Sequence, residues 1–219
     1  MKYNTVLFDM DGTLMDSNEL ICDSWHYTMG TLTDRTITEE EIRGTLGEPL
    51  VDSMLRLLPD VDVELALETY RVYQRGIYLD RIKLFPGTEE FLHAVKKTGS
   101  AMAIVTSRMR SSTERGLNHV GITDFFDLIL TVEDTPVGKP DPAPLYLALD
   151  KLGRAPEDAI FIGDTTHDVE AGLAAGVFTL LVDWSFALPP ETRKDGVLPS
   201  GIRPNLIAYK WDDVLPLLT

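Results

Sequence analysis

The chain has 219 residues, 44% of them hydrophobic, which is enough to bury a full core as one domain or as a domain with an insert. Its formal net charge of −15 argues against nucleic acid or an anionic membrane as a partner. The single cysteine, Cys22, excludes an internal disulfide and suits a reducing compartment. The sequence has no signal-peptide pattern at its start, and no apolar run approaches the ~18 residues needed to span a bilayer. We therefore expect a soluble, cytoplasmic protein.

Short apolar runs alternate with helix-like stretches, which predicts a parallel sheet covered by helices, in a Rossmann-like α/β fold. The apolar character of these runs is nearly continuous, as expected for strands that are buried on both faces. In chain order the predicted strands are residues 3–8, 101–105, 128–132, 159–162 and 179–182, with a last strand at 206–208.

A long segment between the first two strands contains no strand-like run. Its helix candidates are residues 18–29, 38–46, 50–57 and 63–79. Thr38 and Glu41 form a capping-box pattern at the start of the second candidate. Four short helices in this place predict a small α-helical cap domain at 15–80, inserted into a core domain of 1–14 and 81–219. Further along, the Pro/Gly-rich stretch 188–204 indicates an irregular surface excursion before the last strand.

Polar residues follow or adjoin the ends of several predicted strands. Asp9 and Asp11 come directly after the first strand, and Thr106 comes directly after the second. Lys139 lies between the third and fourth strands, and Asp164 follows the fourth. Open parallel sheets bind ligands beyond the carboxyl ends of their strands, at the switch in strand order. We therefore expect these side chains to meet in one crevice.

This ordered set resembles the haloacid dehalogenase superfamily, in its phosphatase branch with a small helical cap. The resemblance runs from Val6 to about Trp184 and is nearest to phosphoglycolate phosphatase-like and pyrophosphatase-like members. It implies that the first strand is central in the sheet, between the strands that lead to Thr106 and to Asp164.

Four aspartates, Asp9, Asp11, Asp164 and Asp168, would then converge, and such a cluster repels itself unless a cation compensates it. An all-oxygen site that pairs with phosphate favours Mg²⁺. By resemblance, the direct ligands are one Asp9 oxygen, the Asp11 backbone carbonyl and Asp164, while Asp168 acts through a bound water.

The resemblance also implies roles for the catalytic residues. Asp9 is the nucleophile that forms an aspartyl-phosphate, and Asp11 is the acid toward the leaving alcohol and then the base toward water. Thr106 and the Ser107 backbone N–H bind phosphate oxygens, and Lys139 neutralises the charge that develops in transfer. The presence of Asp11 favours a phosphatase, because haloacid dehalogenases lack this second acid.

Three further residues are candidates for substrate binding. Arg43 and Glu48 lie in a stretch that resembles the cap loop that faces the active site in these phosphatases. Arg108, just after Thr106 and Ser107, is placed to reach a second anionic group on the substrate.

The sequence thus predicts a Mg²⁺-dependent phosphatase that hydrolyses a small, phosphoglycolate-like phosphomonoester. A β-phosphoglucomutase-like phosphotransferase and an inorganic pyrophosphatase remain open as alternatives. A binding or regulatory protein on a retired enzyme fold is disfavoured, because the chain keeps the nucleophile, the acid and the lysine. The expected partner is a small-molecule phosphate ester, and the expected state is a monomer or a homodimer.

Overall fold

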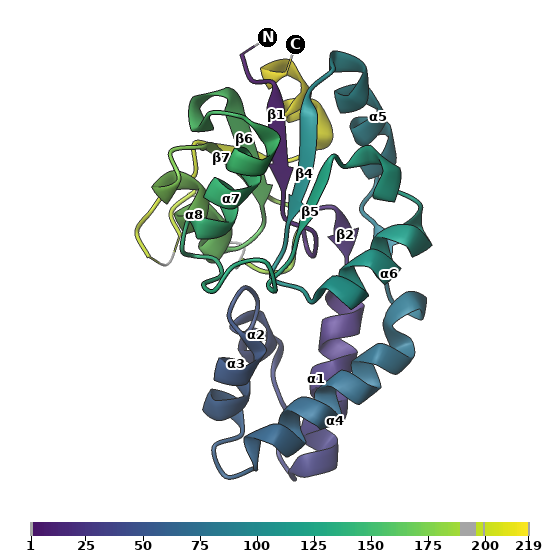
Figure 1. Cartoon of the computed structure of the whole chain (residues 1–219). Helices are drawn as coiled ribbons and strands as arrows, with labels where there is room; N and C mark the ends of the chain where they lie inside the picture. Colours follow the sequence, from purple (N-terminus) through teal and green to yellow (C-terminus); the bar gives the residue numbers. More distant parts are fainter. Residues whose placement is uncertain (1, 189–195, 199, 219) are drawn as a thin grey trace.

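The computed structural model describes residues 2–188, 196–198 and 200–218, and its centre is a six-stranded parallel sheet (Figure 1). The strand order is β5-β4-β1-β6-β7-β8. The predicted strands coincide with the observed ones to within two residues at each end. They are β1 (Thr5–Phe8), β4 (Ala101–Val105), β5 (Leu128–Leu130), β6 (Ala159–Gly163), β7 (Phe178–Val182) and β8 (Leu206–Ala208).

Strand β1 lies between β4 and β6, and both pairings are parallel. This confirms the central place expected for the first strand. All four residues of β1 are buried, as suits a strand covered on both faces. Since the pairings are parallel, the carboxyl ends of β1, β4 and β6 meet at one edge of the sheet.

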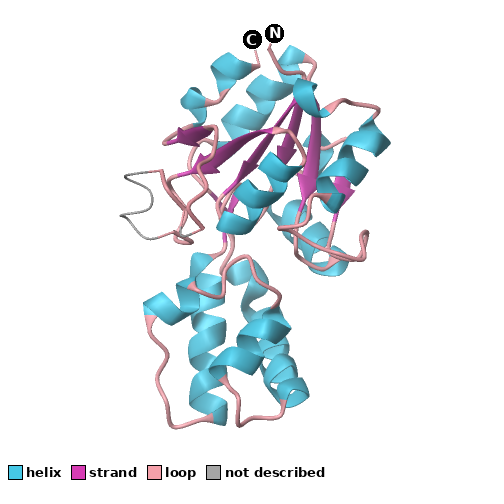
Figure 2. Cartoon of the chain, turned by 90° about the vertical axis from the view of Figure 1, so that its left-hand side faces the viewer, coloured by secondary structure: helices cyan, strands magenta, loops and turns pink. Residues whose placement is uncertain are grey.

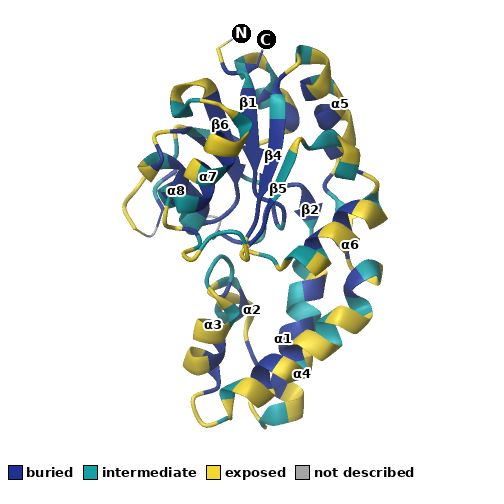
Figure 3. Cartoon of the chain, viewed as in Figure 1, coloured by how far each residue is buried: buried dark blue, intermediate teal, exposed yellow. Residues whose placement is uncertain are grey.

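Helices cover both faces of the sheet, and the side chains of successive residues in β1 pack on opposite faces. Val6 and Phe8 belong to one buried cluster, which also contains residues of α5 (Thr88–Thr98) and α6 (Arg110–Val120). Leu7 belongs to the other, which contains residues of α7 (Ala143–Leu152) and α8 (Thr166–Ala174). Figure 3 shows this burial concentrated in the strands. The sheet is therefore the middle layer of three, and its carboxyl edge is left for ligands.

The segment after β1 contains four helices, as predicted, and we call them the helical insert. They are α1 (Asn18–Leu32), α2 (Glu39–Arg43), α3 (Leu50–Leu57) and α4 (Val63–Ile77). The insert has a buried cluster of its own, built around Trp25, Met54 and Tyr70. It lies at the end of the molecule away from the two termini, beyond the carboxyl edge of the sheet (Figures 1 and 2). The division at residues 15 and 80 into cap and core domains stays a prediction.

Three of the four helices differ from their predicted bounds. The first, predicted at 18–29, extends to Leu32. The second predicted helix, 38–46, ends at Arg43 because the chain turns there, and Thr38 and Glu41 make the expected capping box at its start. The fourth, 63–79, becomes α4 followed by the short 3₁₀ helix η1 (Tyr78–Asp80).

A two-stranded ribbon was not predicted. Strand β2 (Met15–Asp16) pairs antiparallel with β3 (Lys83–Leu84), where the chain enters and leaves the helical insert. Strands of two residues are too short to show a period in the sequence.

Of the predicted excursion 188–204, residues 189–195 and 199 lie outside the described residues, and the described remainder contains no helix or strand. None of the helices that the structure describes is long and apolar enough to cross a membrane.

Candidate active site

The turn after β1 brings Asp9 and Asp11 to the carboxyl edge of the sheet, and Gly12 makes this turn possible. Gly12 has a φ of +78°, in the left-handed region that favours glycine. A Cβ built on Gly12 would also lie only 2.0 Å from Asp164 Oδ2. Glycine is therefore required both for the backbone conformation and for the close approach of Asp164.

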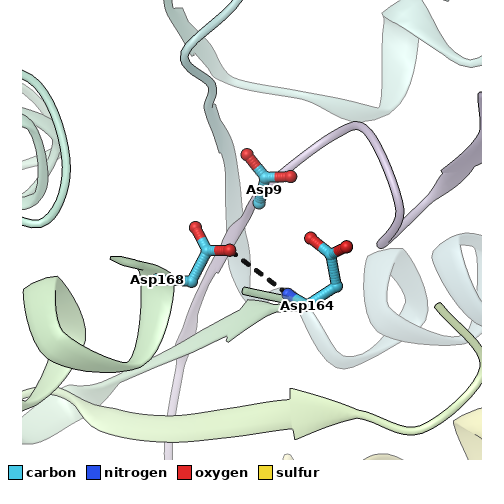
Figure 4. A group of neighbouring side chains, drawn as sticks. All are labelled: Asp9, Asp164 and Asp168. Atoms are coloured by element: carbon cyan, nitrogen blue, oxygen red, sulfur yellow. Dashed lines mark hydrogen bonds between the residues drawn. The ribbon is translucent and has the colours of Figure 1, made fainter. Parts of the chain in front are cut away.

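Asp9, Asp164 and Asp168 form a buried group that we call the acid cluster (Figure 4). Each contributes a carboxylate oxygen, and these oxygens lie within 4.8 Å of one another. Asp9 directly follows β1, whereas Asp164 and Asp168 come from the turn after β6 and the first turn of α8.

The start of α8 fixes Asp168. Its Oδ2 accepts hydrogen bonds from the backbone N–H groups of Asp164 at 3.3 Å and of Thr165 at 3.0 Å. Thr165 Oγ1 donates to the same oxygen at 2.6 Å, within a capping box. A Cβ on Gly163 would lie 2.3 Å from the Asp168 Cβ, so the helix can approach the strand only because this residue is glycine.

Lys139 lies between two members of the acid cluster. Its Nζ donates to Asp9 Oδ1 and to Asp168 Oδ1, at 2.6 Å each, and to the carbonyl of Val105 at 3.1 Å. These contacts use all three donors of the ammonium group. The side chain is only 5% exposed, so the ion pairs are shielded from solvent.

The acid cluster carries more negative charge than Lys139 can balance. Burial raises the pKa of Asp9 to about 7, although Lys139 acts in the opposite direction. Burial, followed by the charges of Asp168 and Asp9, raises the pKa of Asp164 well above its ordinary value. Burial acts on Asp168 in the same sense, but the charge and hydrogen bond of Lys139 hold the pKa of Asp168 below its ordinary value. Two of the three carboxylates therefore favour a proton or a second cation.

A divalent cation fits this donor set. Asp164 Oδ1 is buried and has no hydrogen-bond partner among the described residues, whereas Oδ2 accepts from Ser185 Oγ at 2.5 Å. A hard cation would give Oδ1 a partner and would compensate the repulsion within the acid cluster, and carboxylate oxygens are the ligands that Mg²⁺ prefers. The Asp11 carboxylate is not part of the cluster.

Arg108 holds the carboxylate of Asp11 in a bidentate ion pair. Arg108 Nε lies 2.7 Å from Asp11 Oδ2, and Nη2 lies 2.8 Å from Oδ1. The guanidinium also stacks over the ring of Tyr78, with 4.9 Å between Cζ and the ring centroid. The predicted substrate-binding arginine and the predicted proton-transfer residue thus contact each other at the edge of the acid cluster.

Thr106 and Ser107 follow β4, next to β1. Thr106 is buried, and its Oγ1 accepts the backbone N–H of Arg108 at 3.2 Å. Ser107 is exposed. Both residues lie at the same edge of the sheet as Asp9.

The two predicted substrate-binding residues of the helical insert contact no member of the acid cluster. Arg43 Nε donates to the carbonyl of Phe186 at 3.0 Å, and the guanidinium lies 4.6 Å from the centre of the Phe186 ring. Glu48 pairs with Arg56 and accepts a hydrogen bond from Ser53. Arg43 therefore contacts the turn that follows β7, while Glu48 makes its contacts within the insert.

The sequence analysis missed Ser185 and Tyr78, which contact Asp164 and Arg108. A signal for Ser185 exists, because it lies shortly after the end of β7, where polar residues of such sheets gather. Tyr78 gives no such signal, because its contact with Arg108 depends on the fold of the chain around η1.

Comparison with known proteins identifies the family. A family model described as haloacid dehalogenase-like hydrolase matches residues 6–182. Pyrophosphatase PpaX of Bacillus cereus (strain AH820) is 33% identical over 219 residues, which are 100% of this chain and 98% of that protein.

Solved structures agree over the whole chain. A haloacid dehalogenase-like hydrolase from Streptococcus pneumoniae is 28% identical with a TM-score of 0.83, covering 100% of this chain and 99% of its own. A Lactobacillus plantarum protein, provisionally assigned as a phosphoglycolate phosphatase, is 25% identical with a TM-score of 0.83, covering 99% and 100%. Together with the acid cluster at the carboxyl edge of the sheet, these matches show that the chain is an enzyme and belongs to the haloacid dehalogenase-like hydrolase family.

Proposed function

We propose that this enzyme is a Mg²⁺-dependent phosphatase that hydrolyses a small, phosphoglycolate-like phosphomonoester through an aspartyl-phosphate on Asp9. The observation that carries the proposal is the surroundings of Asp9. Its buried carboxylate is paired with Lys139 at 2.6 Å and clusters with Asp164, whose Oδ1 has no hydrogen-bond partner among the described residues, and Asp11 lies two residues further along. A nucleophile, a fixed cation, a metal-binding oxygen and a proton donor are thus available at one edge of the sheet.

The first half of the reaction uses Asp9 and Asp11. An Asp9 oxygen attacks phosphorus in line, so that a new P–O bond forms while the bond from phosphorus to the substrate oxygen breaks. In this proposal Asp11 leaves its ion pair with Arg108, becomes protonated and gives its proton to that departing oxygen, which leaves as an alcohol. Lys139 stays between Asp9 and Asp168 and balances the charge of the reacting group.

The second half regenerates the enzyme. Asp11, now ionised, takes a proton from a water molecule, whose oxygen attacks phosphorus and breaks the bond to Asp9. Inorganic phosphate leaves, and both aspartates return to their starting states. Thr106 and the Ser107 backbone N–H, which follow β4, would bind phosphate oxygens in both halves.

Mg²⁺, held by Asp9, Asp164 and the Asp11 carbonyl with Asp168 acting through water, would neutralise the phosphate and the attacking carboxylate when bound. Residues 15–80, as a cap, would shield the site from bulk water during transfer. We further propose a cytoplasmic location and a monomeric or homodimeric state.

Inorganic pyrophosphatase is the second candidate, because the Bacillus cereus relative named as a pyrophosphatase is similar over its full length. Arg108 is the residue that would bind the second phosphoryl group of such a substrate. A β-phosphoglucomutase-like phosphotransferase would use the same aspartate pair but would return the phosphoryl group to a sugar.

The test is a phosphate-release screen with Mg²⁺ over phosphoglycolate, pyrophosphate and a panel of hexose phosphates. We expect the highest kcat/KM for a small phosphomonoester. Preference for pyrophosphate would replace the leading candidate with the second. Conversion of β-glucose 1-phosphate into glucose 6-phosphate without phosphate release would establish the phosphotransferase.

A further inference from the structure

The turn that follows β7 contacts both the acid cluster and the helical insert. Ser185 is buried beside Asp164, and the ring of the next residue, Phe186, packs against the buried cluster of the insert. Neither residue has a part in the mechanism above. The turn is therefore a direct physical connection between the metal-binding oxygens and the four helices.

Ser185 determines which oxygen of Asp164 is left for a cation. Its Oγ donates to Asp164 Oδ2 at 2.5 Å and accepts the backbone N–H of Ala187 at 3.1 Å. A serine hydroxyl has one hydrogen, and with Ala187 donating to the oxygen, that hydrogen is directed to the carboxylate. Asp164 Oδ1 remains buried without a partner among the described residues. The hydrogen bond therefore restricts the rotation of the carboxylate and leaves Oδ1 as the oxygen that is free to bind a cation.

Phe186 ties the same turn to the insert through both its side chain and its backbone. The ring contacts the buried cluster of the insert and lies under the Arg43 guanidinium, 4.6 Å from its Cζ. The Phe186 carbonyl accepts from Arg43 Nε at 3.0 Å. Phe186 lies between Ser185 and Ala187, inside the turn that their hydrogen bond closes. A displacement of the insert would consequently displace Ser185.

We propose that residues 185–187 form a clasp that couples the position of the helical insert to the metal-binding geometry of Asp164. Phe186 follows the insert through Arg43, and Ser185 is a positioning residue that holds Asp164 with Oδ1 toward the cation. With the insert in contact, the carboxylate is held in its binding rotamer. When the insert moves away, the hydrogen bond from Ser185 loosens and the cation is held less tightly. This inference rests on the Mg²⁺ site of the proposed function.

The test measures Mg²⁺ affinity by isothermal titration calorimetry on the full chain without substrate, so that no step of catalysis enters the readout. Ser185→Ala should weaken Mg²⁺ binding roughly tenfold or more, as loss of a hydrogen-bond partner of a metal ligand does. Phe186→Ala should weaken it by about threefold, the scale of coupling between linked sites. In the double variant, Phe186→Ala should add no further loss, because the connection through Ser185 is already broken.

Two controls accompany these variants. Ser185→Thr keeps the hydroxyl and should bind Mg²⁺ like the wild type. Leu55→Ala truncates a side chain of the insert that is 55% exposed, and it should leave the affinity unchanged. Circular dichroism and thermal melting check that each variant is folded.

Wild-type affinity in Ser185→Ala would overturn the positioning role. Wild-type affinity in Phe186→Ala, or losses that simply add in the double variant, would overturn the coupling. A wild-type chain that binds no Mg²⁺ would instead overturn the cofactor of the proposed function, and the clasp with it.

Discussion

The burial of Asp9 determines how this residue can act. A carboxylate in this position is shielded from water, and burial raises its pKa to about 7, yet Lys139 remains within 2.6 Å to favour the ionised form. An additional cation at Asp164 would favour ionisation further. When it is ionised, Asp9 is thus a poorly solvated anion, which suits its proposed role, because such a carboxylate is a better nucleophile than one that is fully hydrated.

Replacement of Asp9, the proposed nucleophile, gives the first prediction. Asp9→Asn should lower kcat by on the order of 10³-fold or more, because amide oxygen does not form the covalent intermediate. The change is isosteric and relieves repulsion in the acid cluster, so the melting temperature should not fall. Steady-state phosphate release measures the loss, and a variant that keeps a tenth of the wild-type rate would contradict the covalent mechanism.

The second prediction separates Asp11 from Asp9. Asp11→Asn should impair alkyl phosphates much more than p-nitrophenyl phosphate, whose leaving group needs little protonation. The measurement is kcat for both substrates with the same variant protein, so that a general loss of folded enzyme would lower both values equally. Equal losses for both would assign Asp11 to structure, as the ion-pair partner of Arg108.

At the scale of the elements, buried strands were the most predictable part of the chain. Each predicted sheet strand has a matching strand in the structure, and the nearly continuous apolar runs are typical of the central strands, which are buried on both faces. The helical character of the insert was predicted from its lack of strand-like runs and from the capping-box pattern of Thr38 and Glu41. Strands β2 and β3 were missed because two residues show no period.

The site was predictable only in part. Asp9, Asp164 and Lys139 could be placed together because their positions follow from the ends of parallel strands. The contact of Arg108 with Asp11 could not, since these residues are 97 positions apart and meet through side-chain rotamers. Arg43 was expected to face the substrate. Its contact with Phe186 could not be predicted, because it depends on how the insert packs against the turn that follows β7.

The packing of α6 against η1 gives a prediction that uses two helical glycines. A Cβ on Gly116 in α6 would lie 2.2 Å from the hydroxyl of Tyr78, whereas nothing lies within 4 Å of a Cβ on Gly76 in α4. Gly116→Ala should lower the free energy of unfolding by roughly 1–3 kcal/mol, the usual effect of overpacking. Gly76→Ala should raise it by roughly 0.4–1 kcal/mol, because alanine restricts the unfolded chain.

Denaturant unfolding of the two glycine variants measures both expected changes in the free energy of unfolding, a decrease for Gly116→Ala and an increase for Gly76→Ala. A stabilised Gly116→Ala protein would show that α6 and the residues around Tyr78 are not packed as described. A destabilised Gly76→Ala protein would show that α4 makes a contact at Gly76 that the structure does not include.

At the scale of the whole molecule, all three carboxylates of the acid cluster lie at the carboxyl edge of the sheet. The helical insert lies beyond this edge (Figure 1). The termini lie at the opposite end of the molecule. The acid cluster and the helical insert thus belong to different parts of the chain, which meet at contacts such as that of Arg43 with Phe186.

Removal of the metal tests the acid cluster as a unit. Activity should disappear with EDTA and return with excess Mg²⁺, because Lys139 alone does not balance the three carboxylates. Excess Ca²⁺ should inhibit, since it takes more oxygen ligands at longer distances and would draw both oxygens of Asp9 away from attack. Full activity in the presence of chelator would rule out the proposed metal site.

The covalent aspartyl-phosphate is the central claim, and trapping it is the most direct test. Enzyme quenched in acid during turnover of its best substrate would be reduced with borohydride, which converts an aspartyl-phosphate into homoserine, and then digested for peptide mass spectrometry. We predict homoserine at position 9, present with substrate and Mg²⁺ and absent without substrate. Homoserine at another aspartate, or an unmodified Asp9 in enzyme that releases product in a rapid burst before its steady state, would contradict the account.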